Sequence, residues 1–315
     1  MPDEHKNLEL LGMVTKYSKP LVGIVKAVGP FILSQSKLAS ENYSNFKLDK
    51  ERLEALSVFL KEEARLLAEE RSKWRVIMCE KSGLDRVHAE NNFNMLTREL
   101  NKLSTIDKVK NFVGEDEEIK STVEISDAWI EQFNKLASSL NEEWRKELLA
   151  KAFAKELKNP GTMSLVLLNC IGSFDEKTFR YFGALVNSAI RFKELYLLPI
   201  EQTSTSMVYN IDGQRVSRGT IEYSLSHLNL IDSANRTLKG EKDIPIYITY
   251  GKRILELVNP HGDIPVANLN IRLFTGLGNN IATLYDGSSS AEGNSNFDIF
   301  RDALTKSIYI VREIK

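Results

Sequence analysis

Residues 48–103 form a long run of strong helix formers, and this run constrains the fold more than any other segment. Glu, Lys, Arg, Leu and Ala dominate it, and these residues have high helix propensities. Ser82 and Gly83 interrupt the run, so we expect two helices rather than one. An apolar stripe with three- and four-residue spacing follows the first helix: Leu53, Leu56, Leu60, Ala64, Leu67 and Arg71. The pattern predicts an antiparallel hairpin, or a coil through which copies of the chain associate.

The chain divides into five predicted segments. An apolar N-terminal segment at 1–47 precedes long charged helices at 48–112. An acidic linker at 113–125 leads to a helical bundle at 126–192, and an α+β part follows at 193–315. The predicted fold class is therefore mainly α with a smaller α+β part: N-terminal long helices and a helical bundle, then a winged-helix-like C-terminal domain.

The N-terminal segment contains an apolar stretch, KPLVGIVKAVGPFIL, at residues 19–33. It is shorter than the roughly 20 residues that a membrane-spanning helix needs, and Pro30 would break or kink a helix. The stretch is interpreted either as a helix that docks on the protein or on a second copy, or as a segment lying on a membrane surface. The candidate residues for membrane contact or self-association are Leu21, Ile24, Val25, Val28, Phe31 and Ile32.

The first residues, MPDEHKNLEL, are acidic rather than basic, unlike the start of a signal peptide. We therefore expect a cytoplasmic protein. If the apolar stretch at 19–33 lies on a membrane, we expect the protein at the periphery of the inner membrane.

Capping residues set the predicted helix boundaries in the bundle. Ser126 is expected to cap the first helix and Asn141 the second. Ser173 and Glu176 have the spacing of a capping box for the last helix of the bundle.

A Pro-Gly pair separates two apolar helical runs of the bundle. Pro160 excludes the helical conformation at the residue before it, and Gly161 tolerates a positive φ, so the preceding helix is expected to end near Lys158. Thr162 or Ser164 is expected to cap the short helix that follows. The pair is thus interpreted as a tight corner between helices rather than as an active-site loop.

After residue 192 the pattern changes to short β-like runs. Asp212-Gly213 is a hairpin signal, and a helix that ends at Asn229 is expected after it. We then expect a strand directly after Asn229, a further strand at IPIYIT, and a helix at YGKRILELVN that Thr249 caps. This order resembles a winged helix. The tail is predicted to contain strands at NLNIRLF, NIATLYD and SIYIVREI and a helix at NFDIFRDALTK.

No pattern in the sequence points to a catalytic, cofactor or metal site. Cys79 and Cys170 lie far apart, and none of the four histidines has a metal-binding spacing. The sequence lacks a P-loop and a nucleophile elbow, and GLGNN lacks the third glycine of a phosphate loop. We therefore assign no catalytic residue, no cofactor and no metal. Whether the protein is an enzyme stays open, with the negative answer favoured.

Charge gives little support for nucleic-acid binding. The chain has 42 Lys and Arg against 43 Asp and Glu, so no global field attracts a polyanion. The helix that reads DNA in a winged helix corresponds here to GTIEYSLSHLNL, which has no basic residue, and we expect a packing or protein-contact role for it. For the alternative, nucleic-acid binding, the candidate contacts are Arg215, Arg218, Arg236 and Lys239.

Residues 124–186 carry a family resemblance. An acidic linker precedes the aromatic-containing helix DAWIEQFNKLASS, and then come a KELKNPG run, the short leucine-rich helix SLVLLN and SFDEKTF. This series resembles the prokaryotic domain of unknown function 2806 family, most strongly over 126–192. The tail after Pro260 departs from the pattern. More distantly, the helical part is similar to abortive-infection alpha-type proteins, which are associated with phage defence.

These observations predict a non-enzymatic prokaryotic interaction protein. The resemblance implies a role in antiviral defence of the abortive-infection kind, through self-association or membrane contact. We expect a homo-oligomer or a complex with another protein. The alternative is a nucleic-acid-binding regulator that uses the winged-helix-like part.

Overall fold

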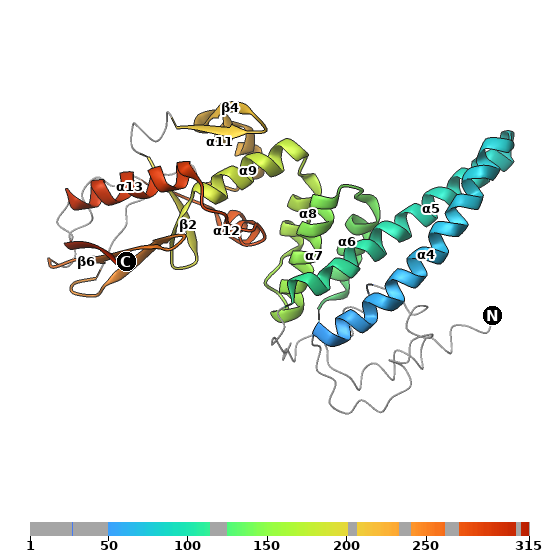
Figure 1. The fold of residues 1–315 in the computed structure, drawn as a ribbon, viewed down its shortest axis with the longest axis horizontal. Coiled ribbons are helices and arrows are strands. Elements are labelled where there is room, and N and C mark those ends of the chain that lie inside the picture. The colour runs from blue at the N-terminus through green and yellow to red at the C-terminus, as the bar shows by residue number, and fades with distance from the viewer. Residues whose placement is uncertain are drawn as a thin grey trace, which may run out of the picture. The chain divides into compact units, whose positions relative to one another are not determined.

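The computed structural model describes residues 27, 50–113, 125–200, 207–232, 241–261, 271–306 and 310–314. The chain separates into two compact units, Met1–Gly172 and Ser173–Lys315. The described part of the first unit is helical, and the second unit combines helices with a six-stranded antiparallel sheet (Figure 1). The predicted fold class, mainly α with a smaller α+β part, is confirmed.

Two long helices, α4 (Lys50–Glu80) and α5 (Gly83–Lys108), form a hairpin in the first unit. They run side by side (Figure 1), and Gly83 takes a φ of 60° where the chain reverses. The predicted break at Ser82-Gly83 is confirmed. From the predicted stripe, Leu56 and Leu60 are buried, because the base of the hairpin packs on the rest of the unit. A short 3-10 helix, η2 (Val109–Phe112), continues α5.

Three further helices follow in the described part of the first unit: α6 (Asp127–Ser139), α7 (Glu143–Lys158) and α8 (Leu165–Ser173). The Ser126 hydroxyl accepts a hydrogen bond from the Trp129 amide, so the predicted cap of α6 is confirmed. Trp129, Phe133 and Phe153 pack together with ring centroids 4.6–5.5 Å apart. Asn141 does not cap α7, where Glu142 holds the capping position. The side-chain oxygen of Asn141 instead accepts a hydrogen bond from the Asn101 side chain of α5 at 2.7 Å.

The corner after α7 is closed by a buried carboxylate. Glu156 is only 2% exposed, and its two carboxylate oxygens accept hydrogen bonds from the amides of Gly161 (2.6 Å) and Met163 (2.9 Å). The Met163 carbonyl in turn accepts a hydrogen bond from the Trp129 ring at 2.6 Å. Gly161 has a φ of 92°, as its glycine predicts. The interpretation as a helix corner is confirmed, and Glu156 supplies a bond that the capping argument missed.

The Glu156 carboxyl is expected to make the stability of the first unit depend on pH. Burial raises its pKa above the ordinary 4.5, and the amides of Gly161 and Met163 only partly oppose this shift. The folded chain therefore binds this proton more tightly than the unfolded chain does. The resulting stabilisation is fully present below pH 4.5 and is lost as the pH rises through the raised pKa.

The check is denaturant unfolding followed by tryptophan fluorescence, because all three tryptophans, Trp74, Trp129 and Trp144, belong to the first unit. Glu156→Gln removes the titration. We expect the free energy of unfolding of the wild type, relative to this variant, to decrease from pH 4.5 toward neutrality. A difference that stays constant over this range would contradict the assignment.

The second unit is built on one sheet with strand order β7-β2-β1-β5-β6-β8. All of its neighbouring strands are antiparallel. The strands are β1 (Ile190–Phe192), β2 (Leu195–Pro199), β5 (Ile246–Tyr250), β6 (Arg253–Val258), β7 (Ile271–Leu273) and β8 (Ile310–Ile314). A separate hairpin, β3 (Val208–Ile211) and β4 (Gln214–Ser217), turns at Asp212-Gly213 as predicted.

The helices in the described part of the second unit are α9 (Glu176–Ser188), α11 (Arg218–Leu225), η3 (Ser226–Leu228), α12 (Gly276–Ala282) and α13 (Ala291–Thr305). Helix α13 covers one face of the sheet, where Phe297, Phe300 and Leu304 pack on Ile248 and Leu255. Helix α9, which we predicted as part of the bundle, packs with α11 and α13 of this unit. Asp175 caps α9 by accepting from the Thr178 amide at 2.6 Å, so the predicted Ser173–Glu176 capping box is wrong.

In the C-terminal part of the chain, one predicted helix is a strand and one predicted strand is a helix. The predicted helix after Thr249 is strand β6, because Gly251 takes a φ of 56° and turns the chain back along β5. Leu255 and Leu257 are both buried, and this two-residue spacing is that of a strand. The predicted strand NIATLYD instead overlaps helix α12, which Thr275 caps by accepting from the Gly278 amide. The predicted strands at IPIYIT, NLNIRLF and SIYIVREI overlap β5, β7 and β8, and the helix at α13 is confirmed. Instead of the strand predicted after Asn229, the described residues have an isolated bridge between Ile231 and Phe274.

Candidate functional site

Most of the sequence-predicted contact residues cannot be placed. The set for membrane contact or self-association, Leu21, Ile24, Val25, Val28, Phe31 and Ile32, lies outside the described residues, as do Arg236 and Lys239. Arg215 lies exposed on β4. No helix in the described part of the chain is long and apolar enough to cross a bilayer.

Arg218 lies in the interior of the second unit, with 2% of its surface exposed. Its guanidinium donates to the Glu222 carboxylate at 2.8 Å and to the Pro199 carbonyl at 2.6 Å. Glu222 also accepts a hydrogen bond from Arg272, so a carboxylate on α11 joins two arginines. Buried charges of this kind are held by their partners. We therefore remove Arg218 from the candidate DNA contacts, because a phosphate contact needs a guanidinium at the surface.

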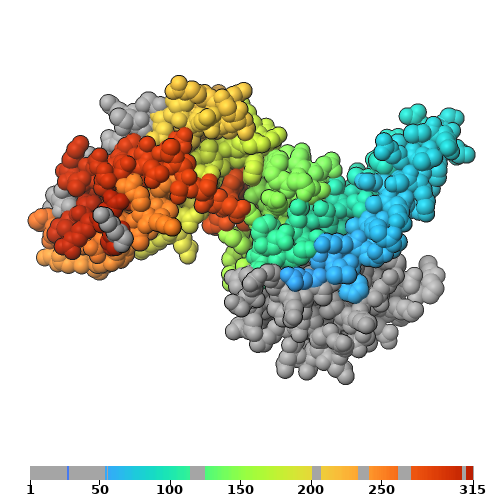
Figure 2. Space-filling model, viewed as in Figure 1, coloured from blue at the N-terminus to red at the C-terminus, as the bar shows by residue number. Residues whose placement is uncertain are grey.

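The end of the α4–α5 hairpin presents apolar side chains to solvent. We call residues 71–87 the hairpin tip. Within it, Val76, Leu84 and Val87 are 55%, 77% and 50% exposed. Figure 2 shows this end of the hairpin, in cyan, standing clear of the green helices of the same unit on the visible face. Grouped exposed apolar side chains of this kind mark contact surfaces more often than isolated ones do.

Charge divides along the same hairpin. The tip carries five Lys or Arg and two Asp or Glu. The adjoining shaft, residues 61–70 and 88–99, carries three Lys or Arg and six Asp or Glu. The tip is therefore net positive and the shaft is net negative. Two apolar side chains of the shaft, Leu66 and Met95, are also about half exposed.

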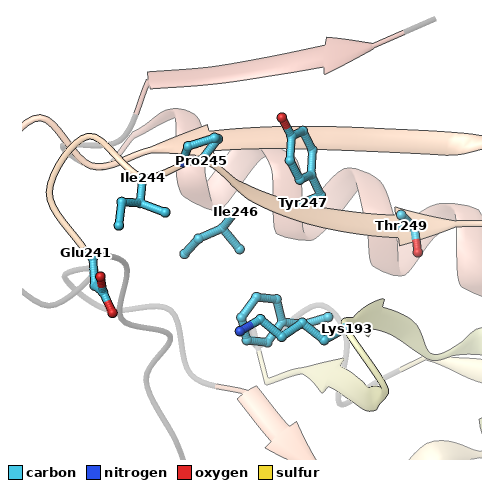
Figure 3. A pocket seen from close by; sticks show the side chains of 8 residues that line it. Lys193, Glu241, Ile244, Pro245, Ile246, Tyr247 and Thr249 are labelled. Carbon is cyan, nitrogen blue, oxygen red and sulfur yellow. The ribbon is translucent and has the colours of Figure 1, made fainter.

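A cavity of about 400 Å³ opens beside β5 in the second unit. Figure 3 shows Ile244, Pro245 and Ile246 along one side and Lys193 from the β1–β2 turn opposite them. The Lys193 ammonium lies 5.5 Å from the centre of the Phe192 ring. The lining residues are Phe192, Lys193, Glu241, Ile244, Pro245, Ile246, Tyr247 and Thr249. These residues suit an apolar or amphipathic guest and provide no paired nucleophile and base.

The described residues contain no group of three or more His, Cys, Asp or Glu that could hold a metal ion. Burial raises the pKa of the Cys170 thiol to about 11, so it is protonated at neutral pH and a poor nucleophile. Burial also raises the pKa of Tyr209, whose hydroxyl lies 2.8 Å from the Ser188 hydroxyl. These groups are structural. The sequence analysis allowed self-association of these two helices but did not single out Val76, Leu84 and Val87. Val76 lies beyond the predicted apolar stripe of the first helix, and that position is the signal that could have found it.

Comparison with known proteins gives a family and no function. A family model described as protein of unknown function (DUF2806) matches residues 94–296, more than half of the chain. This match begins within α5 and ends within α13, so α4 and the hairpin tip lie outside it. No curated protein and no solved structure matches the chain. The comparisons therefore lend no support to a relation with abortive-infection proteins, and they identify the chain as a member of the DUF2806 family of proteins of unknown function.

Proposed function

We propose that this protein is a non-enzymatic interaction protein that associates with a second copy of itself through the tip of its α4–α5 hairpin. The observation that carries the proposal is the exposure of Val76, Leu84 and Val87 at the tip. Burying such side chains between two copies removes apolar surface from water, which is the main favourable term in association. A role in prokaryotic antiviral defence rests on the sequence resemblance alone and adds nothing to this argument.

Charge complementarity favours a second copy as the partner. When two hairpins pack side by side in opposite directions, the positive tip of each lies along the negative shaft of the other. This arrangement has two-fold symmetry, so the same surface serves both copies. Opposite charges also set the relative direction of the two hairpins. Leu66 and Met95 on the shaft add exposed apolar surface to the part of the hairpin that the tip of the second copy would contact.

The test is sedimentation velocity of the full chain over a range of concentrations. The triple variant Val76→Gln, Leu84→Gln, Val87→Gln keeps helix-forming residues and removes the apolar tip. We expect its dissociation constant for self-association to rise at least about tenfold. The matched control is Tyr223→Gln, which removes an apolar side chain that is 83% exposed on α11, and it should associate like the wild type.

The dependence of association on salt concentration provides a second test. Because opposite charges align the hairpins, raising the ionic strength should weaken wild-type association. A wild-type monomer at all concentrations would refute the proposal. Equal association of the wild type and the triple variant would refute the tip as the contact and leave the apolar stretch at 19–33 as its replacement.

A further inference from the structure

We infer that the second unit contains an anion site that binds a phosphate group, in a cavity between the end of α9, the β1–β5 strands and the loop that joins α12 to α13. The cavity has a volume of about 260 Å³. Six of its lining residues carry the argument: Asn187, Arg191, Thr249, Gly287, Ser288 and Ser289. This inference is independent of hairpin association.

Arg191 supplies the charge. It lies exposed in the middle of β1, and its register partners are Tyr196 on β2 and Thr249 on β5. The guanidinium stacks 4.6 Å over the Tyr196 ring and donates one hydrogen bond to the Tyr196 hydroxyl at 2.6 Å. Across the described ranges, no carboxylate lies within ion-pair distance of it. The arginine is thus fixed in place, while most of its donors stay available to a ligand.

The loop supplies two hydroxyl donors to the cavity, and its amides hold it in place. The Ser288 amide donates to the Asn187 side chain at 3.3 Å, and the Ser290 amide donates to the Tyr250 hydroxyl at 2.6 Å. Tyr250 in turn donates to the Asn187 carbonyl at 2.8 Å. These bonds hold the segment 287–289 against the sheet. Within the part of the chain that the structure describes, the hydroxyls of Ser288 and Ser289 have no hydrogen-bond partner, so they are free to donate into the cavity.

Two glycines lie beside the arginine and the serines of the cavity. A Cβ atom at Gly287 would lie 3.4 Å from the Arg191 guanidinium, and one at Gly251 would lie 2.6 Å from the Ser289 hydroxyl. A larger residue at Gly251 would therefore displace the Ser289 hydroxyl, whereas at Gly287 a Cβ atom would be in ordinary van der Waals contact with the guanidinium. The absence of side chains there lets the loop approach both the arginine and the β5–β6 turn.

The hydrogen-bond donors that line the cavity indicate which ligand it binds. The residues lining the cavity include one cation and several hydroxyl or amide groups, and none of them is Asp, Glu or Lys. A guanidinium with hydroxyl donors matches the tetrahedral oxygens of a phosphate, because charge-assisted hydrogen bonds to a planar fork are strong and directional. The volume accommodates a phosphate group with a small substituent. Free phosphate and a small phosphate monoester share this chemistry.

The test is titration of the full chain with inorganic phosphate and, separately, with glycerol 3-phosphate, at constant ionic strength. Binding is followed by the NMR shifts of the Gly287 and Ser288 amides. We expect saturable shifts at these amides, and at least a tenfold loss of affinity in Arg191→Ala. The double variant Ser288→Ala, Ser289→Ala should also bind more weakly. Tighter binding of the monoester would point to a phosphorylated metabolite, and equal or tighter binding of phosphate would point to the free ion.

The matched control is Arg215→Ala, which removes an exposed arginine of β4 that does not line the cavity. It should bind like the wild type. Arg191→Lys keeps the charge without the fork and should bind with intermediate affinity, which separates recognition from a general charge effect. No saturable shift with either probe, or equal affinities of the wild type and Arg191→Ala, would overturn the inference.

Discussion

Replacing Gly278 of α12 with alanine is expected to destabilise the second unit strongly. A Cβ atom at this position would lie 1.9 Å from the Leu230 carbonyl oxygen, far inside van der Waals contact. This oxygen accepts a hydrogen bond from the Thr275 amide at 3.0 Å, so it cannot move away without losing that bond. We expect a loss of about 3 kcal/mol or more, the upper range for overpacking.

The neighbouring Gly276 provides the control. It lies in the same helix, and a Cβ atom there would meet nothing within 4 Å. Gly276→Ala should change stability by less than about 1 kcal/mol, with a slight gain expected because alanine restricts the unfolded chain. Hydrogen exchange of the amides in α12 and β2, read by mass spectrometry, measures both variants. Equal protection in the two variants would contradict the close approach of Gly278 to Leu230.

Replacing Glu156 with alanine is expected to destabilise the first unit by about 3 kcal/mol. The substitution leaves the buried amide of Met163 and the amide of Gly161 without their acceptor, and it opens a small cavity at the end of α7. Each unsatisfied donor costs roughly 1–3 kcal/mol. The corner would lose the bonds that position Met163 for the Trp129 ring, so the fluorescence of the folded state should change as well.

Glu147 is the matched control for this variant. It lies on the same helix, its side chain is exposed, and the structure gives it no hydrogen bond to the corner. Glu147→Ala should unfold within about 0.5 kcal/mol of the wild type, as surface substitutions usually do. Denaturant unfolding followed by tryptophan fluorescence compares the two variants. If both unfolded alike, the carboxylate of Glu156 would not be the group that closes the corner.

The sequence correctly predicted the helix ends and turns that depend on contacts between residues close together in the chain. Ser126 caps α6 because its hydroxyl reaches an amide three residues away. Asn229 ends its helix with a φ of 51°, and Asp212-Gly213 turns a hairpin, because both need a positive φ that these residue types tolerate. The break at Ser82-Gly83 belongs to the same class. In each case the decisive contact lies within a few residues.

The elements and positions that the sequence did not predict depend on pairing with other strands or on burial. The segment RILELV of β6 is compatible with a helix by propensity, and its pairing with β5 and β8 decides the strand. Asn279 of α12 accepts a hydrogen bond from the Tyr196 amide, 83 residues away in the sequence. Glu156 and Arg218 are charged residues that a sequence pattern assigns to solvent, and only their buried partners reveal the interior positions.

The carboxylate of Glu156 has a consequence for how sequences of this family diverge. Its two oxygens accept hydrogen bonds from the amides of Gly161 and Met163, which the chain brings into reach by turning at Gly161. Among the described residues, these two amides have no other acceptor. A glutamate at 156 stabilises the corner only while residue 161 is a glycine, and the glycine is favoured only while the glutamate is present. Across relatives, the residues at 156 and 161 should therefore be inherited as a pair. A lineage that loses the glycine is expected to replace the glutamate as well and to join its helices by a corner of different length.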